Sequence, residues 1–573
     1  MVKHRLSFLP PALTAAALLL STVSASAVAC KAVPANQPPS NDAEKAYFAG
    51  DFKTAANEYQ KLLAAHPEDP NISERLVWSL IQSGDTDAAA SAAKAVLAAH
   101  GDSAAAQTAQ GEVLFRQGHI DEADKAFSRA TQLDPCYPFA RIGIARVARA
   151  SSMFASSRAA IRTAYALDPA DPEIRMLWIS TLPTADQVSQ LKKLLEQSNA
   201  LGEQQTKRLQ ARLDRDEERL DDPGQQSCHL VSSVDQTEIP MVPIMRDATH
   251  MRNWALDTSV DGKTARLAID TGASGLLLGR AFAEHAGLKF KQDTKIGGFG
   301  DKGPRLAHLA YASSIRIGKL EFQNCVVEVT DSREVLGMDG LIGTDVFHSY
   351  LVSIDFPDHK LELSPLPPRP GPDSNPAIMS LSTSADQSSS ESVSGSSQSS
   401  TNRGPYDAYV APDMKSFTPV FRFGHLLLIR TSINNGPLAL MVLDTGDFAM
   451  SISSEAAKGV THAHVDSVDS FHGLSGRVEK LATGGKIDLR FGHAAATVDD
   501  ILVMDHSGMS RNIGTEISGF LGYPALRSLV FQIDYRDGLV NFIYDKNKDA
   551  FRAQGPAPPC GGCVPTGYVH PDQ

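Results

Sequence analysis

The sequence has little of what marks nucleic-acid-binding, membrane-spanning or metal-dependent proteins. It carries 54 basic against 66 acidic side chains, a net charge of −12, and no block of basic residues, which argues against nucleic-acid binding. Beyond its first 30 residues it has no apolar run long enough to span a bilayer. G-x-S-x-G, H-E-x-x-H and paired Cys/His motifs are also missing, so serine, zinc and cysteine hydrolases find no support. No metal and no other cofactor is predicted.

The N-terminus has the pattern of an export signal. A positive stretch, Lys3 to Arg5, precedes a short apolar run at 12–23, and small residues lead up to Cys30. We therefore predict that residues 1–29 are a signal peptide and that the protein is periplasmic or extracellular. The alternative is a lipid anchor on Cys30, which would make the protein a membrane-anchored lipoprotein.

The six cysteines make disulfides a reasonable expectation in an exported chain. Cys228 and Cys325 flank the first of two D-T-G motifs and are the preferred pair. Cys136 lies in a helical region and is predicted to be a buried free thiol. Cys560 and Cys563 stand in a Pro/Gly-rich tail and are expected to form a local or intermolecular disulfide.

The first third of the chain is a repeat array. Gly50, Gly84, Gly118 and Ser152 stand 34 residues apart, with small residues five positions after each and mostly proline seventeen positions after. This register resembles tetratricopeptide repeats, which implies antiparallel helix pairs over 41–180 and a surface for a protein partner. A structural spacer is the equal alternative. Residues 181–224 are expected to be a capping or spacer helix.

The remainder contains two copies of one β unit, at 230–365 and 406–550. Each copy has the same landmarks in the same order: a hairpin turn, D-T-G, a glycine-rich turn, G-L-I-G or G-F-L-G, and I-D-F or I-D-Y. The Pro/Ser-rich stretch 366–405 between them is predicted to be a disordered linker. The tail, 551–573, is also predicted to be disordered.

These landmarks resemble the retropepsin-like aspartic proteases, relatives of one pepsin lobe. The resemblance implies a multidomain chain in which all-α repeats precede two all-β lobes. It also implies an aspartic peptidase, because two facing carboxylates that share one proton can activate water and protonate a carbonyl oxygen. Asp270 and Asp444 would be the two halves of one intramolecular pair, and a peptide or protein would be the substrate.

The resemblance assigns further residues to the site. The active-site loops comprise Thr271, Gly272 and Ala273 in the first copy, and Thr445, Gly446 and Asp447 in the second. The two threonine hydroxyls are expected to bond across to the opposite loop. Flaps that close over the substrate are expected at Gly297, Gly298, Phe299 and Gly300, and at Gly473, Leu474, Ser475 and Gly476.

The second copy departs from the family pattern at Asp447, where alanine or serine is usual. A third carboxylate beside the pair would raise the cost of ionising either catalytic aspartate, unless Asp447 points outward or caps the following turn. Two alternatives to the intramolecular enzyme stay open. One is a lobe-1 homodimer that uses Asp270 from two chains, and the other is a non-catalytic peptide-binding scaffold.

Overall fold

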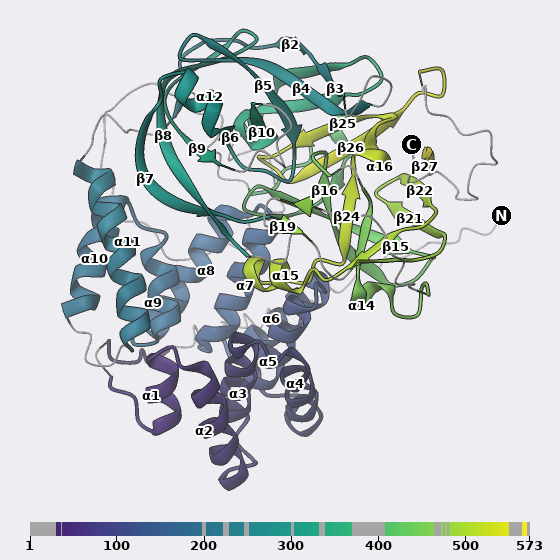
Figure 1. Cartoon of the computed structure of the whole chain (residues 1–573). Helices are drawn as coiled ribbons and strands as arrows, with labels where there is room; N and C mark the ends of the chain where they lie inside the picture. The colour runs from purple at the N-terminus through teal and green to yellow at the C-terminus, as the bar shows by residue number, and fades with distance from the viewer. Residues whose placement is uncertain are drawn as a thin grey trace, which may run out of the picture.

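The structure is a computed structural model with a helical array below two β lobes (Figure 1), as the sequence predicts. It describes residues 30–35, 37–196, 202–221, 228–245, 251–298, 303–331, 339–369, 407–447, 449–462, 472–473, 476–477, 481–548 and 564–569. The signal peptide, nearly all of the predicted linker and the pair Cys560 and Cys563 lie outside the described residues.

The helices of the array follow the predicted period. The residues that separate paired helices, Gly50, Gly84, Gly118 and Ser152, all have positive φ angles between 61° and 89°. Glycine reaches this conformation at little cost, which explains the repeated glycine column. The helices are α1 Asp42–Phe48, α2 Phe52–Ala65, α3 Pro70–Ser83, α4 Thr86–His100, α5 Ala104–Arg116, α6 Ile120–Leu133, α7 Pro138–Ala150, α8 Phe154–Leu167 and α9 Pro172–Ile179.

The segment predicted as a single capping helix contains two, α10 (Thr184–Glu196) and α11 (Glu203–Asp221). The beginning of α11 returns to α1, because a Cβ on Gly202 would lie only 2.6 Å from the carbonyl oxygen of Ala49. The Tyr47 hydroxyl of α1 also donates to Glu173 of α9 at 3.3 Å. The two ends of the array therefore touch, a long-range contact that leaves no periodic signal in the sequence.

The segment before α1 is tied to the array by a disulfide. Cys136 is joined to Cys30, so its prediction as a free thiol is wrong. The pairing links residues 106 positions apart, and only the folding of the array brings the α6–α7 connection next to the N-terminal segment. The Val33 N–H also donates to the Leu167 carbonyl at 2.9 Å. Because the Cys30 sulfur is in a disulfide, it has no thiol to carry the alternative lipid anchor.

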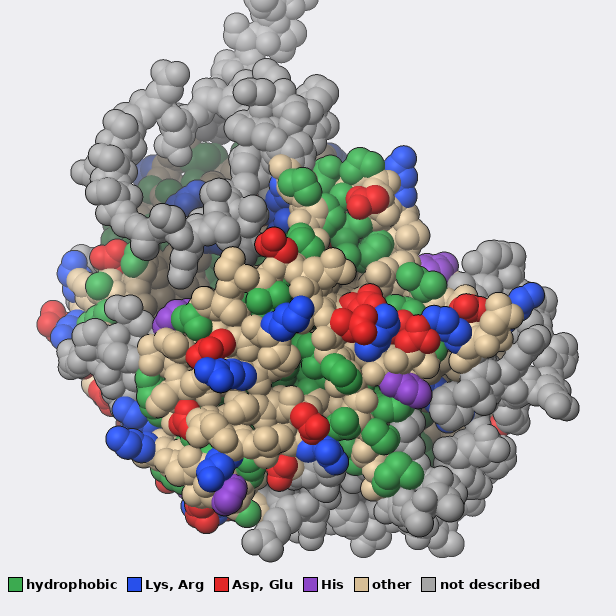
Figure 2. Space-filling view, turned by 90° about the horizontal axis from the view of Figure 1, so that it is seen from above, with side chains coloured by type: hydrophobic (Ala, Val, Ile, Leu, Met, Phe, Trp, Pro, Cys, Tyr) green, Lys and Arg blue, Asp and Glu red, His purple; other side chains and the backbone are tan. Residues whose placement is uncertain are grey.

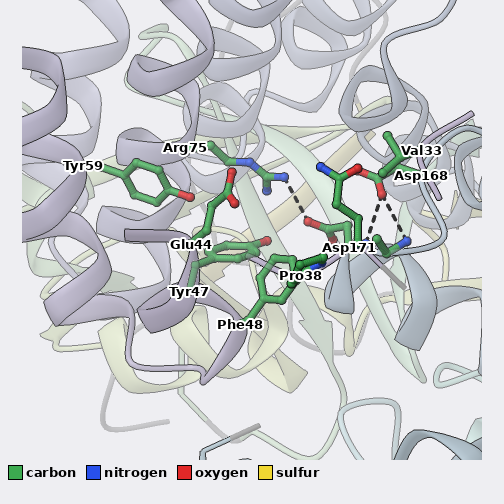
Figure 3. Close-up of a pocket in the computed structure, with 11 residues that line it drawn as sticks. Val33, Pro38, Glu44, Tyr47, Phe48, Tyr59, Arg75, Asp168 and Asp171 are labelled. Atoms are coloured by element: carbon green, nitrogen blue, oxygen red, sulfur yellow. Dashed lines mark hydrogen bonds and ion pairs between the residues drawn. The ribbon is translucent and has the colours of Figure 1, made fainter. Parts of the chain in front are cut away.

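An open pocket of about 100 Å³ lies between this segment and the two ends of the array (Figure 3). Arg75 donates to Asp171 at 3.0 Å on one side of it, and Tyr59 and Glu44 lie nearby. Its lining residues are Val33, Gln37, Pro38, Glu44, Tyr47, Phe48, Tyr59, Arg75, Asp168, Ala170 and Asp171. The chain's own N-terminal segment thus covers part of the surface between the ends of the array.

The Cys30–Cys136 disulfide should contribute substantially to stability. Because it closes a loop of about a hundred residues, we expect Cys136→Ser to lower the free energy of unfolding by about 3 kcal/mol. Chemical denaturation of the oxidised proteins measures this loss. Cys30→Ser should cost the same, and the double variant should cost no more than either single one. Additive losses would contradict the bond.

Lobe 1 is built around a sheet in the order β1-β9-β6-β10-β5-β4-β8-β7, with β3 beside β4. The disulfide between Cys228 and Cys325 ties the chain before β1 to β9. The elements are β1 His229–Leu230, β2 Thr237–Pro240, β3 Val242–Met245, β4 Met251–Val260, β5 Lys263–Asp270, β6 Leu276–Gly279, α12 Arg280–His285, β7 Lys289–Ile296, β8 Arg305–Ile317, β9 Leu320–Thr330, β10 Gly340–Gly343, β11 Tyr350–Asp355 and β12 Lys360–Pro365.

Lobe 2 repeats the central part of this topology in the order β20-β23-β17-β24-β16-β15-β21-β22-β27. Its elements are β13 Thr418–Pro419, β14 Phe421–Phe423, β15 Leu426–Ile433, β16 Leu438–Asp444, β17 Ser451–Ser453, α14 Ser454–Ala457, β18 His472–Gly473, β19 Gly476–Arg477, β20 Leu481–Thr483, β21 Ile487–Phe491, β22 Ala494–Val498, β23 Leu502–Met504, α15 Ser507–Ile513, β24 Gly519–Gly522, α16 Tyr523–Leu526, β25 Leu529–Asp534, β26 Leu539–Tyr544 and β27 Val564–Val569.

Strand β27 corrects the prediction that the whole tail is disordered. It pairs in parallel with β22, which would otherwise be an edge strand of the lobe-2 sheet. The proline- and glycine-rich composition around it is typical of a loop, so only the available sheet edge accounts for the strand.

A sheet shared by both lobes holds them together. Its order is β13-β26-β25-β11-β12-β2, and β11 of lobe 1 pairs antiparallel with β25 of lobe 2, with Ser353 opposite Gln532. Ile354 and Phe531, which face each other in this register, are fully buried in a hydrophobic core that includes residues of both lobes. The shared strands and core fix the orientation of the lobes.

The helical array packs directly on lobe 2. Phe115, Phe127 and Val147 of the array share one buried cluster with Val442 and Phe520 of the lobe. Arg430 adds a bidentate ion pair to Asp121, with distances of 2.7 and 2.6 Å. The array is therefore a fixed part of the molecule.

None of the helices in the described segments is long and apolar enough to cross a bilayer. The face seen from above carries acidic and basic side chains close to one another, with hydrophobic side chains among them (Figure 2).

Candidate active site

The two D-T-G loops follow equivalent strands. β5 ends at Asp270 and β16 at Asp444, and each strand is apolar and buried in the residues just before its aspartate, where it lies inside its sheet. Each pairs in parallel with a short strand that contains the apolar-apolar-glycine step. Asp270 stands opposite Gly343 of β10, and Asp444 opposite Gly522 of β24. The two loops thus leave their sheets at matching positions.

Threonines lock the loops to each other. The Thr271 N–H donates to the Thr445 hydroxyl at 3.1 Å, and the Thr445 N–H donates to the Thr271 hydroxyl at 2.9 Å. Each hydroxyl then donates to a carbonyl of the opposite strand, Leu443 at 2.8 Å and Ile269 at 3.1 Å. Both threonines are fully buried, so this reciprocal set is shielded from competing water.

The loop glycines allow the carboxyls to approach the opposite loop. A Cβ on Gly272 would lie 2.4 Å from Asp444 Oδ2, and one on Gly446 would lie 2.4 Å from Asp270 Oδ2. Each glycine N–H also donates to the Oδ1 of its own aspartate, at 2.8 Å in lobe 1 and 2.9 Å in lobe 2. Any side chain at either glycine would displace the neighbouring carboxyl.

The two carboxyls differ in their electrostatic environment. Burial raises the pKa of Asp270 well above its usual range, and the charge of Asp444 and the hydrogen bond between the two carboxyls raise it further. Burial also raises the pKa of Asp444, but the hydrogen bond from Asp270 and the N–H groups of Gly446 and Asp447 oppose this shift. Asp444 accepts two N–H groups where Asp270 accepts one, so its anion is the better stabilised of the two.

Asp447, the residue that departs from the family pattern, caps its own turn. It is 4% exposed, and its Oδ1 accepts the Ala449 N–H at 3.0 Å. In lobe 1 the corresponding N–H, that of Gly275, donates instead to Asp345 at 2.9 Å. Lobe 2 has Pro524 at the position of Asp345. Asp447 therefore supplies the turn acceptor that Asp345 supplies in lobe 1.

The remaining oxygen of Asp447 has no hydrogen-bond partner among the residues that the structure describes. Burial raises the pKa of Asp447 well above its usual range, and the charge of Asp444 adds to the shift. Asp447 therefore keeps its proton to a higher pH than an exposed aspartate, which limits its repulsion of the catalytic pair.

Asp447→Asn should remove a source of pH-dependent stability while keeping an oxygen for the Ala449 N–H. Because folding raises the pKa of Asp447, its stabilising contribution is complete below the unfolded pKa and is lost as pH rises through the folded pKa. We expect the Tm of the variant to exceed that of the parent by about 3 °C near pH 7 and to match it near pH 3.5. Asp447→Ala, which also removes the turn acceptor, should lower the Tm at both pH values. An identical pH dependence of Tm in the parent and Asp447→Asn would contradict this account.

Further polar residues support the loops across the lobe interface. The Asn253 amide of lobe 1 donates to the Thr445 carbonyl at 2.8 Å, and His425 Nε2 of lobe 2 lies 3.0 Å from the Gly272 carbonyl. The Trp254 indole donates to the Tyr523 hydroxyl at 3.1 Å. Sequence reasoning missed these residues. Their signal is faint, since each is a polar group beside or within an apolar strand.

The predicted flaps fall on hairpins only partly within the described residues. Gly297 and Gly298 follow β7, which pairs antiparallel with β8. Gly473 and Gly476 face each other in the β18–β19 pair. Phe299, Gly300, Leu474 and Ser475 lie outside the described residues. Ala273 continues the first loop, with its N–H 3.4 Å from the Asp270 carbonyl oxygen.

The site is composed of carboxyl and backbone groups. Over the part of the chain that the structure describes, no three His, Cys, Asp or Glu side chains are grouped to hold a metal ion. The arrangement can hold and transfer a proton between the buried carboxyl of Asp444 and the partly buried carboxyl of Asp270.

Comparison with known proteins agrees with this organisation. Residues 256–346 match the aspartyl protease family, and residues 48–113 match a tetratricopeptide repeat family. The chain thus contains a tetratricopeptide-repeat region and an aspartyl-protease-like domain. A curated relative, cellulose synthase operon protein C of Pseudomonas fluorescens (strain SBW25), is 30% identical over 150 residues, covering 25% of this chain and 12% of that protein.

Two solved structures resemble separate parts of the chain. A thermophilic TPR protein of Thermus thermophilus is 20% identical and covers 30% of this chain and 94% of its own, with a TM-score of 0.25. A retropepsin-like aspartic protease from Rickettsia conorii is 21% identical and covers 24% of this chain and 94% of its own, with a TM-score of 0.17.

Proposed function

We propose that the protein is an aspartic endopeptidase that uses Asp270 and Asp444 as one intramolecular pair. The observation that carries the proposal is the interlocked pair of loops, which brings each carboxyl against the glycine of the opposite loop. When two carboxyls lie so near each other in a buried site, they share one proton. A pair with one proton can activate water and protonate a carbonyl oxygen in the same step.

The environments of the carboxyls assign their roles. Asp444 accepts the N–H groups of Gly446 and Asp447, so its anion is the better stabilised and acts as the general base. Asp270 holds the proton and acts as the general acid toward the peptide carbonyl. As water attacks, the proton of the water passes to Asp444 and that of Asp270 to the carbonyl oxygen. Asp444 then gives its proton to the leaving nitrogen as the C–N bond breaks, and one hydroxyl of the tetrahedral diol returns a proton to Asp270, which restores the pair.

The contacts of Thr271 favour the intramolecular pair over a lobe-1 homodimer. Its hydroxyl already accepts from Thr445 and donates to Leu443, both in lobe 2. A second copy of lobe 1 would have to pair with strand β11, and β11 is already paired with β25 of lobe 2. A homodimer would need both sets of bonds to break.

Hydrolysis should show a bell-shaped pH profile. Activity requires one proton on the pair, so it falls at high pH when Asp270 ionises and at low pH when Asp444 is protonated. Since burial and its neighbour raise the pKa of Asp270, the alkaline limb should lie above the ordinary aspartate value of about 3.9.

Cleavage of an unfolded protein by the mature chain with intact disulfides, measured from pH 3 to 8 with and without a pepstatin-type inhibitor, tests this proposal. Inhibitable cleavage with such a profile is expected. A parent protein that cleaves nothing over the whole range would rule out the enzyme and favour the peptide-binding scaffold.

We propose further that the protein acts outside the cytoplasm, in the periplasm or beyond the cell. Disulfides join Cys30 to Cys136 and Cys228 to Cys325, and such bonds persist in oxidising compartments. The repeats belong to a class that binds proteins. In this chain they bind lobe 2, and a further protein partner on their exposed surface is part of the proposal.

A further inference from the structure

The face of lobe 1 beside Asp270 lies under the β7–β8 hairpin. Ala268 and Leu341 stand opposite each other on β5 and β10, each two residues before a loop residue, Asp270 or Gly343. Alternation along β5 places Leu267 and Ile269 in the lobe core, so Ala268 occupies the other face. Leu341 also packs on that face with Leu277, Ile296 and Ala307, the last two from the hairpin.

The equivalent face of lobe 2 lies under the helical array instead. Val442 and Phe520 stand opposite each other on β16 and β24, again two residues before Asp444 and Gly522. They are 0% and 1% exposed, because they share a cluster with Phe115, Phe127 and other apolar residues of α5, α6 and α7. The array thus occupies the place that a hairpin occupies in lobe 1.

Two hydrogen bonds hold the end of α5 against the segment that leads into β24. The Thr515 hydroxyl donates to the Phe115 carbonyl at 2.7 Å, and the Glu516 N–H donates to the Arg116 carbonyl at 2.9 Å. The Phe115 ring contacts Phe423, with ring centres 6.1 Å apart. Phe423 is two residues from His425, which contacts the first D-T-G loop at Gly272. α5 is therefore connected to the candidate active site through the β14–β15 hairpin.

The rim of this cluster is apolar and partly exposed. Leu114 of α5 and Ile144 of α7 contribute from the array, while Phe423, Met509 and Ile513 contribute from lobe 2. A partly exposed apolar rim that is continuous with a buried interface is a favourable place for another apolar group. The rim packs against Val442 and Phe520, which hold the positions relative to Asp444 that Ala268 and Leu341 hold relative to Asp270.

We infer that the helical repeats form the lobe-2 wall of the substrate cleft, where Leu114 and Ile144 receive an apolar side chain of the peptide. This inference rests on the proposed function. It makes the two halves of the cleft unlike: the peptide is held by a β hairpin on the lobe-1 side and by helices on the lobe-2 side. The repeats thereby select the substrate.

Kinetics on a peptide series tests the inference. In each peptide of the series, one leucine on either side of the cleaved bond is replaced by serine. Leu114→Asn and Ile144→Asn should raise KM about tenfold for peptides with leucine at the position facing lobe 2, and leave KM unchanged when serine stands there. Leu62→Asn, a partly buried leucine in α2, is the matched control and should change neither value. Equal changes for all peptides, together with a lower Tm, would mean a structural role and overturn the inference.

Photolabelling separates this inference from the proposed function. A pepstatin-type inhibitor with a photoreactive phenylalanine analogue at either end is irradiated on the full chain, and labelled residues are mapped. Labels on α5 or α7 from one end support the repeat wall, even if the protein cleaves no peptide and the enzyme proposal fails. Cleavage with labels confined to lobes 1 and 2 would instead overturn the repeat wall and leave the enzyme.

Discussion

Asp270→Asn and Asp444→Asn are each expected to reduce peptide cleavage at least about 1,000-fold, because a paired acid and base contribute about 10²–10⁴ each. The amide can neither hold the proton that Asp270 gives to the carbonyl nor take the one that Asp444 receives. The change in kcat is measured on the same peptide with the same oxidised protein.

Folding should survive both substitutions. Burial raises the pKa of each carboxyl, so each loses stabilising power as pH rises through its folded pKa, and a neutral amide avoids that loss. We therefore expect Tm values near neutral pH at or above the parent. Asp257→Asn is the matched control, since this carboxyl of lobe 1 is exposed and pairs with Arg266 at 3.0 Å. Its kcat should not change.

The pattern of loss discriminates between the alternatives. Loss in both variants agrees with the intramolecular pair. Loss in Asp270→Asn alone, with activity that rises steeply with protein concentration, would point to a lobe-1 homodimer.

Gly272→Ala should disable the site through packing alone. The added Cβ would lie 2.4 Å from Asp444 Oδ2, and the interlocked threonines leave the loop no room to move away. We expect kcat to fall at least about 100-fold, because the carboxyls lose their alignment. The free energy of unfolding should fall by about 3 kcal/mol as the buried loops are forced apart.

Gly485→Ala is a matched control for this substitution. A Cβ there meets only the Thr461 hydroxyl, at an ordinary contact distance of 3.6 Å. Its activity and denaturation midpoint should stay close to those of the parent. Full activity in Gly272→Ala would show that the two loops are farther apart than the structure has them.

The Asp447 position shows how far sequence reasoning reached into the site. Comparison of the two copies revealed an extra carboxyl beside Asp444. The sequence left open whether it repels the catalytic pair or caps the following turn. The structure supports turn capping, since Asp447 replaces Asp345 as the acceptor for the turn. It also supports part of the charge clash, because the charge of Asp447 adds to the raised pKa of Asp270. The two lobes differ at two equivalent pairs of positions, Asp345 and Pro524, and Ala273 and Asp447. These pairs are far apart in the chain, so the presence of Asp447 is explained only when both differences are considered together.

Local patterns in the sequence determined most of the architecture. The 34-residue column of turn glycines is required because the chain must reverse through positive φ between paired helices. The ordered landmarks of the two β units likewise specified which strands end at Asp270 and Asp444. Such features depend on residues close in the chain, whose periodicity reports directly on helix, strand and turn.

Only the tertiary structure decided which of these parts touch. It joined Cys30 to Cys136 and paired β27 with the edge strand β22. It also placed the helices α5, α6 and α7 on the lobe-2 face beside Asp444. Burial of apolar surface drives such contacts. Because this driving force depends on the area buried and has no preferred direction, a single sequence does not show which surfaces will meet. The repeats could be recognised from their period, but that they cover Val442 and Phe520 of lobe 2 follows from packing alone.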